Sequence, residues 1–155
     1  MKENRKPVAG KIAVIVTAIL AAVSFILYQV NVTNAGYFQN NTVSAMPLTW
    51  AAVAALGVAF ALSLLKTKGI GGKLVDVLIG LAQIAAPVIL AYCLMSLVSG
   101  RASGLGFLYF SDADVLKEIQ TAENMASGTL TIVSIAFYAV SMVVGWVSSF
   151  ITIRR

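Results

Sequence analysis

Four residues of the apolar stretch 74–99 are of types that could do chemistry inside a membrane: Asp76, Gly80, Gln83 and Pro87. Steps of four, three and four residues put them on one face of an α-helix. Asp76 is ionisable, Gln83 supplies an amide, and Pro87 cannot donate a hydrogen bond to the Gln83 carbonyl. Because polar groups within membrane helices are candidates for function, Asp76, Gln83 and Pro87 form a candidate intramembrane site for an ion or a proton.

The same face also has a structural interpretation. Asp76 lies about one turn inside the expected helix, where the N-terminus favours an acid, and Lys73 is three residues away. Gln83 can bond a neighbouring helix, and proline is common in membrane helices. The sequence leaves both interpretations open.

A second pattern runs through the last apolar stretch, SGTLTIVSIAFYAVSMVVGWVSSFIT. Alternating steps of four and three residues keep one helix face against a neighbour that wraps around it left-handedly. Small side chains and interhelical hydrogen bonds hold helices together in lipid, so we expect a helix-packing seam, with a polar path for substrate or ions as the alternative. The seam residues are Ser127, Thr131, Ser134, Tyr138, Ser141, Gly145, Ser148 and Thr152.

Two further rows of small and polar residues are expected to pack against other helices. One row, in the second apolar stretch, recurs every four residues: Ala51, Ala55, Ala59 and Ser63. The other, in the first stretch, comprises Ala13, Thr17, Ala21, Ser24 and Tyr28.

The composition indicates which elements carry these faces. Hydrophobic residues make up 59% of the 155 residues and charged residues 11%, and the mean hydropathy is +0.91, values typical of a membrane protein. Four stretches with almost no charge are each long enough for a helix that crosses about 30 Å of hydrocarbon. We therefore predict an all-α fold, an integral membrane four-helix bundle forming one domain over residues 1–155. The expected spans are about 11–30, 47–65, 74–99 and 127–152.

The distribution of basic residues predicts the topology. The formal net charge is +5, and nine of the 11 basic residues fall at the N-terminus, in segment 66–73 or at the C-terminus. The positive-inside rule then puts both termini and the 66–73 loop in the cytoplasm, and loops 31–46 and 100–126 outside. The basic charge is thus a topology signal that favours the lipid bilayer as partner and gives no support for binding nucleic acid.

The second outer loop contains a short predicted helix within SDADVLKEIQ. We expect Ser111 to cap it, and the helix to lie on the membrane surface or over the ends of the spans. Thr121 is a second cap, so the last helix should begin near residue 122. Asp112, Asp114 and Glu118 lack the glycine turn of a calcium loop, which favours capping over metal binding. The triplets beginning at Asn31 and Asn40 match glycosylation sequons.

Catalytic motifs are missing from the sequence. There is no histidine, the single cysteine is Cys93, and no nucleophile elbow, zinc-protease motif, Walker loop or pair of intramembrane acids occurs. We expect no catalytic, cofactor-binding or metal residues, and no enzyme activity.

The motif YFSDADVLKEIQTAENMAS, placed before the last span, resembles small uncharacterised four-span membrane proteins of Gram-positive bacteria. That resemblance implies no activity. Small multidrug-resistance transporters have a similar span count, but they use a glutamate deep in the first span and shorter loops, and this chain has neither.

These observations favour a non-enzymatic protein of a bacterial plasma membrane. We expect an accessory, assembly or interaction subunit that binds a partner protein or further copies of itself. The alternative is a small transporter or channel subunit that uses the polar face of the third span.

Overall fold

The computed structural model describes residues 6–65, 69–151 and 153, and all regular secondary structure among them is helical. The helices, in order, are α1 (Lys6–Thr33), α2 (Leu48–Ser63), α3 (Gly69–Phe110), α4 (Ala113–Ile119) and α5 (Ala122–Ser149). The predicted all-α fold is confirmed. Three of these helices, α1, α3 and α5, are long and apolar enough to cross a membrane.

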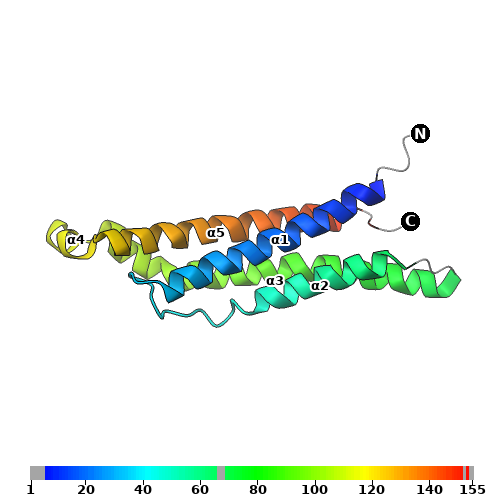
Figure 1. The fold of residues 1–155 in the computed structure, drawn as a ribbon, viewed down its shortest axis with the longest axis horizontal. Coiled ribbons are helices and arrows are strands. Elements are labelled where there is room, and N and C mark those ends of the chain that lie inside the picture. The colour runs from blue at the N-terminus through cyan, green and yellow to red at the C-terminus, as the bar shows by residue number, and fades with distance from the viewer. Residues whose placement is uncertain (1–5, 66–68, 152, 154–155) are drawn as a thin grey trace.

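The four longer helices run side by side along the long axis of the molecule (Figure 1). Helix α1 packs against α5, α5 against α3, α3 against α2, and α2 against α1, so the four contacts close a ring. The start of α1 and the end of α5 lie at one end of the bundle, here called the terminal end, and α4 lies at the other, here called the loop end.

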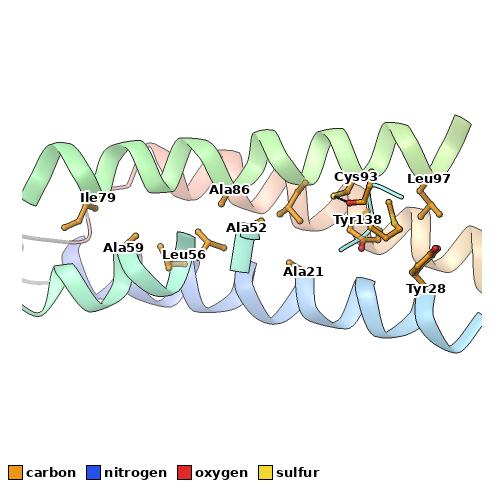
Figure 2. Close-up of a cluster of buried hydrophobic side chains, with 14 of the residues drawn as sticks. Ala21, Tyr28, Ala52, Leu56, Ala59, Ile79, Ala86, Cys93, Leu97 and Tyr138 are labelled. Atoms are coloured by element: carbon orange, nitrogen blue, oxygen red, sulfur yellow. Dashed lines mark hydrogen bonds between the residues drawn. The ribbon is translucent and has the colours of Figure 1, made fainter. Parts of the chain in front are cut away.

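The interior of the bundle is lined by small residues alternating with larger ones (Figure 2). Alanines at four buried positions let the helix backbones approach closely, and leucines fill the space between them. The labelled members of this core are Ala21, Tyr28, Ala52, Leu56, Ala59, Ile79, Ala86, Cys93, Leu97 and Tyr138.

Helix α2 is shorter than the predicted span 47–65. It has 16 residues and is therefore about 24 Å long, less than the hydrocarbon thickness of about 30 Å. Residues 44–47 form turns, and Pro47 occupies the N-cap position. Helix α2 is thus a short apolar helix beside three of spanning length.

The predicted small-residue row of α2 does not form a single buried face. Ala51 is exposed and Ala55 half-buried, whereas Ala59 and Ser63 are buried. Repeated steps of four residues turn around a helix by about 40° each, so such a row drifts off any contact face. The buried face instead alternates steps of three and four residues, through Thr49, Ala52, Leu56, Ala59 and Ser63.

Helix α3 extends well beyond the predicted span 74–99. Its 42 residues make it about 63 Å long, roughly twice the thickness of a bilayer core. The helix continues to Phe110, through the first part of the predicted outer loop 100–126. Residues 34–47, here called the strap, cover this extension: a Cβ built on Gly100 would lie 3.1 Å from a Val43 methyl group, and one on Gly104 would lie 2.7 Å from the Phe38 ring.

The loop end confirms one predicted cap and corrects the other. Helix α5 begins at Ala122, and the Thr121 hydroxyl accepts a hydrogen bond from the Asn124 amide at 3.2 Å. Ser111 does not cap α4, because its hydroxyl donates to the Phe107 carbonyl at 2.7 Å and so completes the end of α3. Asp112 occupies the N-cap of α4 without a side-chain bond. Helix α4 lies at the loop end, over the ends of α3 and α5 (Figure 1).

Candidate functional site

The polar face of α3 lies against the C-terminal part of α5. Gln83 and Pro87 are buried, Gly80 is half-buried and Asp76 is exposed. The Ser149 hydroxyl donates to the Gln83 carbonyl at 2.7 Å, so the carbonyl that Pro87 leaves without a helical donor has a partner on α5. In return, Gln83 Nε2 donates to the Ser148 carbonyl at 3.1 Å.

These two bonds join α3 and α5 in both directions, and we call them the α3–α5 clasp. The first bond satisfies the Gln83 carbonyl, which lacks a helical donor because of Pro87. The second adds a side-chain donor to the Ser148 carbonyl, which also accepts from the Ile151 amide at 3.1 Å after the end of α5. The clasp favours the structural interpretation for the Gln83 amide nitrogen and backbone. The side-chain oxygen of Gln83 and the Asp76 carboxylate take no part in the clasp.

Asp76 and Gln83 line one cavity of about 340 Å³ at the terminal end, between α3 and the residues that follow α5. Pro87 lies outside this cavity and lines a neighbouring, largely apolar one of about 480 Å³. The structure therefore brings two of the three predicted site residues together. Within the described part of the chain no group of three histidine, cysteine or acidic residues could hold a metal ion.

The α5 seam faces the interior over its whole described length. Ser127, Thr131, Ser134, Tyr138, Ser141, Gly145 and Ser148 are buried, and Thr152 lies outside the described residues. On α1, the row from Thr17 to Tyr28 is buried as well, and Ala13 is half-buried. The two rows meet, since α1 and α5 are neighbours in the ring.

At the loop end of the seam, three side chains form a hydrogen-bonded chain with Asn31 at its centre. Asn31 Nδ2 donates to Thr131 Oγ1 at 2.6 Å, and Ser127 Oγ donates to Asn31 Oδ1 at 2.7 Å. The Phe38 amide in turn donates to Ser127 Oγ at 3.1 Å. This group joins α1, α5 and the strap.

Further along the seam, the polar contacts are separated by apolar packing. Ser24 and Ser141 place their hydroxyls 3.2 Å apart, and Thr49 and Tyr138 place theirs 2.7 Å apart. A Cβ on Gly145 would lie 3.1 Å from a Thr17 methyl group and 3.2 Å from Pro87. The Ser134 hydroxyl is buried without a partner among the described residues.

In the sequence, Asn31 begins a glycosylation sequon. Its buried amide bonds both Ser127 and Thr131, so it is not available for glycosylation in the folded bundle. Asn40, which begins the other triplet, is exposed and has a positive φ of 58°. The spacing is the signal that could have identified Asn31 as a bundle residue, because it lies three positions after Tyr28 and continues the α1 row. Its partners could not have been predicted, because they lie about 100 residues away.

The position of Arg101 differs most from the sequence-based prediction. Predicted as a basic residue of an outer loop, Arg101 is fully buried on α3 beneath the strap. Its guanidinium donates to the Asn41 carbonyl and lies over the rings of Phe38, at 4.5 Å from the centroid, and Tyr28, at 5.9 Å. Its Nε and Nη1 atoms have no hydrogen-bond partner in the described part of the chain.

The acids of the second outer loop lie apart from these sites. Asp112, Asp114 and Glu118 are exposed at the loop end, and Asp114 pairs with Lys117 at 3.0 Å. The exposed pair adds little to stability.

Comparison with known proteins does not identify a relative of this chain. No protein-family model, no curated protein and no solved structure matches the chain.

Proposed function

We propose that the chain is a four-span protein of a bacterial plasma membrane, with α2 as its shortest span and both termini in the cytoplasm. The exposed large apolar side chains support this arrangement, since they run from Val8 to Val30 on α1 and from Ile132 to Val147 on α5. On α3 they are interrupted between Val98 and Phe107. The stretches on α1 and α5 correspond to about 33 Å and about 23 Å of helix, on either side of the hydrocarbon thickness of about 30 Å. Nine of the 11 basic residues fall in the N-terminal segment, in segment 66–73 or in the C-terminal segment, and this distribution supports a cytoplasmic side for these segments.

Thiol labelling tests the topology. In a Cys93→Ala background, Gln39→Cys and Glu118→Cys should react with an impermeant thiol reagent added to sealed cells, because both positions are exposed at the loop end. Gly71→Cys, exposed on the first turn of α3, should react only after the membrane is opened. Labelling of Gly71→Cys in sealed cells would contradict the proposed orientation.

Within this topology, we propose that the protein is a non-enzymatic interaction subunit that binds a partner protein, or a further copy of itself, through its loop end. The observation that carries the proposal is the exposure of Phe110, at 87%, and Phe107, at 45%, on the part of α3 beyond Val98. About 12 residues of helix, or about 18 Å, lie between Val98 and Phe110. Lipid tails therefore do not cover these rings, and exposed aromatic groups outside lipid are typical of binding surfaces.

Site-specific photocrosslinking tests this proposal with a matched control. Phe110 and Phe150 are the same residue type with nearly equal exposure, 87% and 89%, at opposite ends of the bundle. A photoreactive phenylalanine at position 110 should give a protein adduct of one discrete mass in intact membranes, and the adduct should be lost when Phe107→Ser is added. The same probe at position 150 should not give that adduct. Identical adducts from both positions, or none from position 110, would contradict the proposal.

A second function, as a small transporter or channel subunit, is favoured by the cavity that Asp76 and Gln83 share. An acid and an amide beside a membrane cavity are groups that could pass a cation or a proton. A flux assay in liposomes tests it: pH-dependent uptake by the natural protein that Asp76→Asn abolishes, with folding unchanged, would favour the transporter over the interaction subunit.

A further inference from the structure

Arg101 carries a positive charge that the bundle encloses without an acidic partner. The side chain is fully buried, and a guanidinium group stays charged in proteins. Its Nη2 atom donates to the neutral Asn41 carbonyl, whereas Nε and Nη1 have no acceptor in the described part of the chain. Because burial of an ion without a counter-ion is costly, a group of negative charge that reaches this guanidinium gains a strong interaction.

The described part of the chain does not supply that group. Its acids are all exposed, and none pairs with Arg101: Asp76, Asp112, Asp114, Glu118 and Glu123. The rings of Phe38 and Tyr28 offset part of the cost of burial, but they leave the Nε and Nη1 donors without an acceptor. The counter-ion of Arg101 is therefore sought in a ligand.

A single layer of chain separates Arg101 from solvent. This layer consists of residues 39–44 of the strap, here called the lid, and five of its six residues are exposed. The lid lies between two buried anchors of the strap, Phe38 and Ala45, which are 1% and 5% exposed. The Asn41 carbonyl that accepts from the guanidinium belongs to the lid. Displacement of this short segment is thus enough to expose the charge.

Three hydrogen bonds tie the lid to α1 and α3. One comes from Arg101. In the second, the Asn40 amide donates to the Val32 carbonyl at 2.8 Å, and in the third, the Val43 amide donates to the Tyr28 hydroxyl at 2.7 Å. Each such bond contributes modestly to stability, because water replaces the lost partner when the bond breaks. The lid can therefore open locally while its anchors and the bundle stay in place.

The chemistry of the exposed guanidinium favours an oxyanion. Opening of the lid also frees Nη2, and the planar array of N–H donors then matches two oxygen atoms of one phosphate or carboxylate group. The outer side of the lid gives a lipid chain no apolar path, because its exposed residues are polar: Gln39, Asn40, Asn41, Thr42 and Ser44. This surface favours a small water-soluble oxyanion over a lipid head group.

We propose that Arg101 is the binding site of a small water-soluble oxyanion, and that the lid opens to admit it. Since Nε and Nη1 are closed off beneath the lid, an oxyanion does not fit under the closed lid, and the bound state is the open one. In the closed state the Asn41 carbonyl takes the place of one oxygen of the ligand. This site goes beyond the proposed interaction through the loop end and does not depend on it.

Inorganic phosphate tests the site in detergent that contains no phospholipid. At constant ionic strength, set with sodium chloride, phosphate should raise the melting temperature of the natural protein along a saturating curve. Arg101→Met, which has a similar volume and no charge, should lose the saturating part. Lys117→Met, at an exposed cation of the loop end, should keep it. The same curve in Arg101→Met and the natural protein would overturn the proposal, because phosphate also stabilises proteins without a binding site.

Hydrogen exchange of two strap amides tests the opening of the lid. The Val43 amide lies in the lid and is bonded to the Tyr28 hydroxyl, whereas the Phe38 amide lies in an anchor and is bonded to the Ser127 hydroxyl at 3.1 Å. Saturating phosphate should speed exchange at Val43 by at least about tenfold and leave Phe38 unchanged, as measured by NMR at constant pH. Unchanged exchange at Val43 would overturn the proposed open state.

Tyr28→Phe provides a variant that should bind more tightly. It keeps the aromatic ring beside Arg101 and removes the hydroxyl that holds the Val43 amide. Because opening then costs one hydrogen bond less, the affinity for phosphate should rise by up to about fivefold. This variant decides the question even if Arg101→Met does not fold. Equal or weaker phosphate affinity in a folded Tyr28→Phe would overturn the proposal.

Discussion

Serine residues of the α5 seam occupy one helix face but differ in what their hydroxyls do. Ser127 donates to Asn31 and accepts from the Phe38 amide, so it joins three segments. Ser141 donates to the Phe137 carbonyl of its own helix and lies near Ser24. Ser134 is buried without a partner among the described residues. These seam serines are thus equal in size, but they differ in the hydrogen bonds that their hydroxyls form.

The same substitution at two of these serines should have different effects. Ser127→Ala should lower the free energy of unfolding by about 1 to 2 kcal/mol, because it removes two buried hydrogen bonds and leaves Asn31 Oδ1 without its donor. Ser134→Ala should change it by less than about 0.5 kcal/mol or raise it, because an unpaired buried hydroxyl is removed. Thermal unfolding in detergent measures both. Equal losses would show that Ser134 has a partner in the membrane.

For single residues, the sequence indicates which polar groups need a hydrogen-bond partner, but it does not identify that partner. Pro87 indicates that the Gln83 carbonyl lacks its helical donor, but the donor, Ser149, is 66 positions away and is set by the register of α5 against α3. Arg101 shows the opposite case. Its charge predicts an outer, solvated position, and its burial follows from the aromatic rings of the strap and α1, which no local pattern relates to it.

The elements that depart most from the sequence-based prediction are the strap and the extension of α3. Glycines at positions 100, 104 and 106 predict a break in the helix, since glycine costs about 1 kcal/mol relative to alanine in a helix. The helix nevertheless continues, because two of these glycines let the strap pack directly on its backbone. By contrast, the start of α5 was predictable, because its cap is a local interaction of Thr121.

Two glycines of this extension provide a test of the strap. A Cβ on Gly104 would lie 2.7 Å from the Phe38 ring and 2.9 Å from the Tyr37 ring, and Phe38 is buried. Gly104→Ala should therefore lower the free energy of unfolding by about 1 to 3 kcal/mol. Gly106→Ala meets nothing within 4 Å and should raise it by about 0.5 to 1 kcal/mol through helix propensity.

Thermal unfolding of the two variants, beside cysteine accessibility in the strap, measures this difference. Ala45→Cys, at a buried position of the strap, should react faster with a thiol reagent in the Cys93→Ala background when Gly104→Ala is present, because the strap is displaced. If Gly104→Ala is as stable as Gly106→Ala and the reaction rate is unchanged, the strap does not pack on α3 as described.

In the whole molecule, the ring of four helices explains why polar residues lie at the interior faces of the helices. Each neighbouring pair in the ring needs contacts other than the hydrophobic effect, because lipid is as apolar as the helix surfaces. Small residues and paired polar groups supply these contacts at the interior faces, and apolar side chains remain outside. The composition and the spacing of residues predicted this division of faces. They did not predict the length of α3, which depends on the strap.

The central claim, that the α5 seam packs the bundle together, is tested most directly by comparing Gly145→Leu with Val143→Leu. Gly145 faces Thr17 and Pro87 at distances that a Cβ would already make tight, whereas Val143 is 54% exposed two positions away on the same helix.

The measurement is the free energy of unfolding in detergent, with the oligomeric state recorded beside it. Gly145→Leu should lower that free energy by at least about 1 to 3 kcal/mol or change the oligomeric state, and Val143→Leu should stay within about 0.5 kcal/mol of the natural protein. If the seam lined a pore instead, Gly145→Leu would block flux while the bundle stayed as stable. Equal tolerance of leucine at both positions would contradict the packing seam.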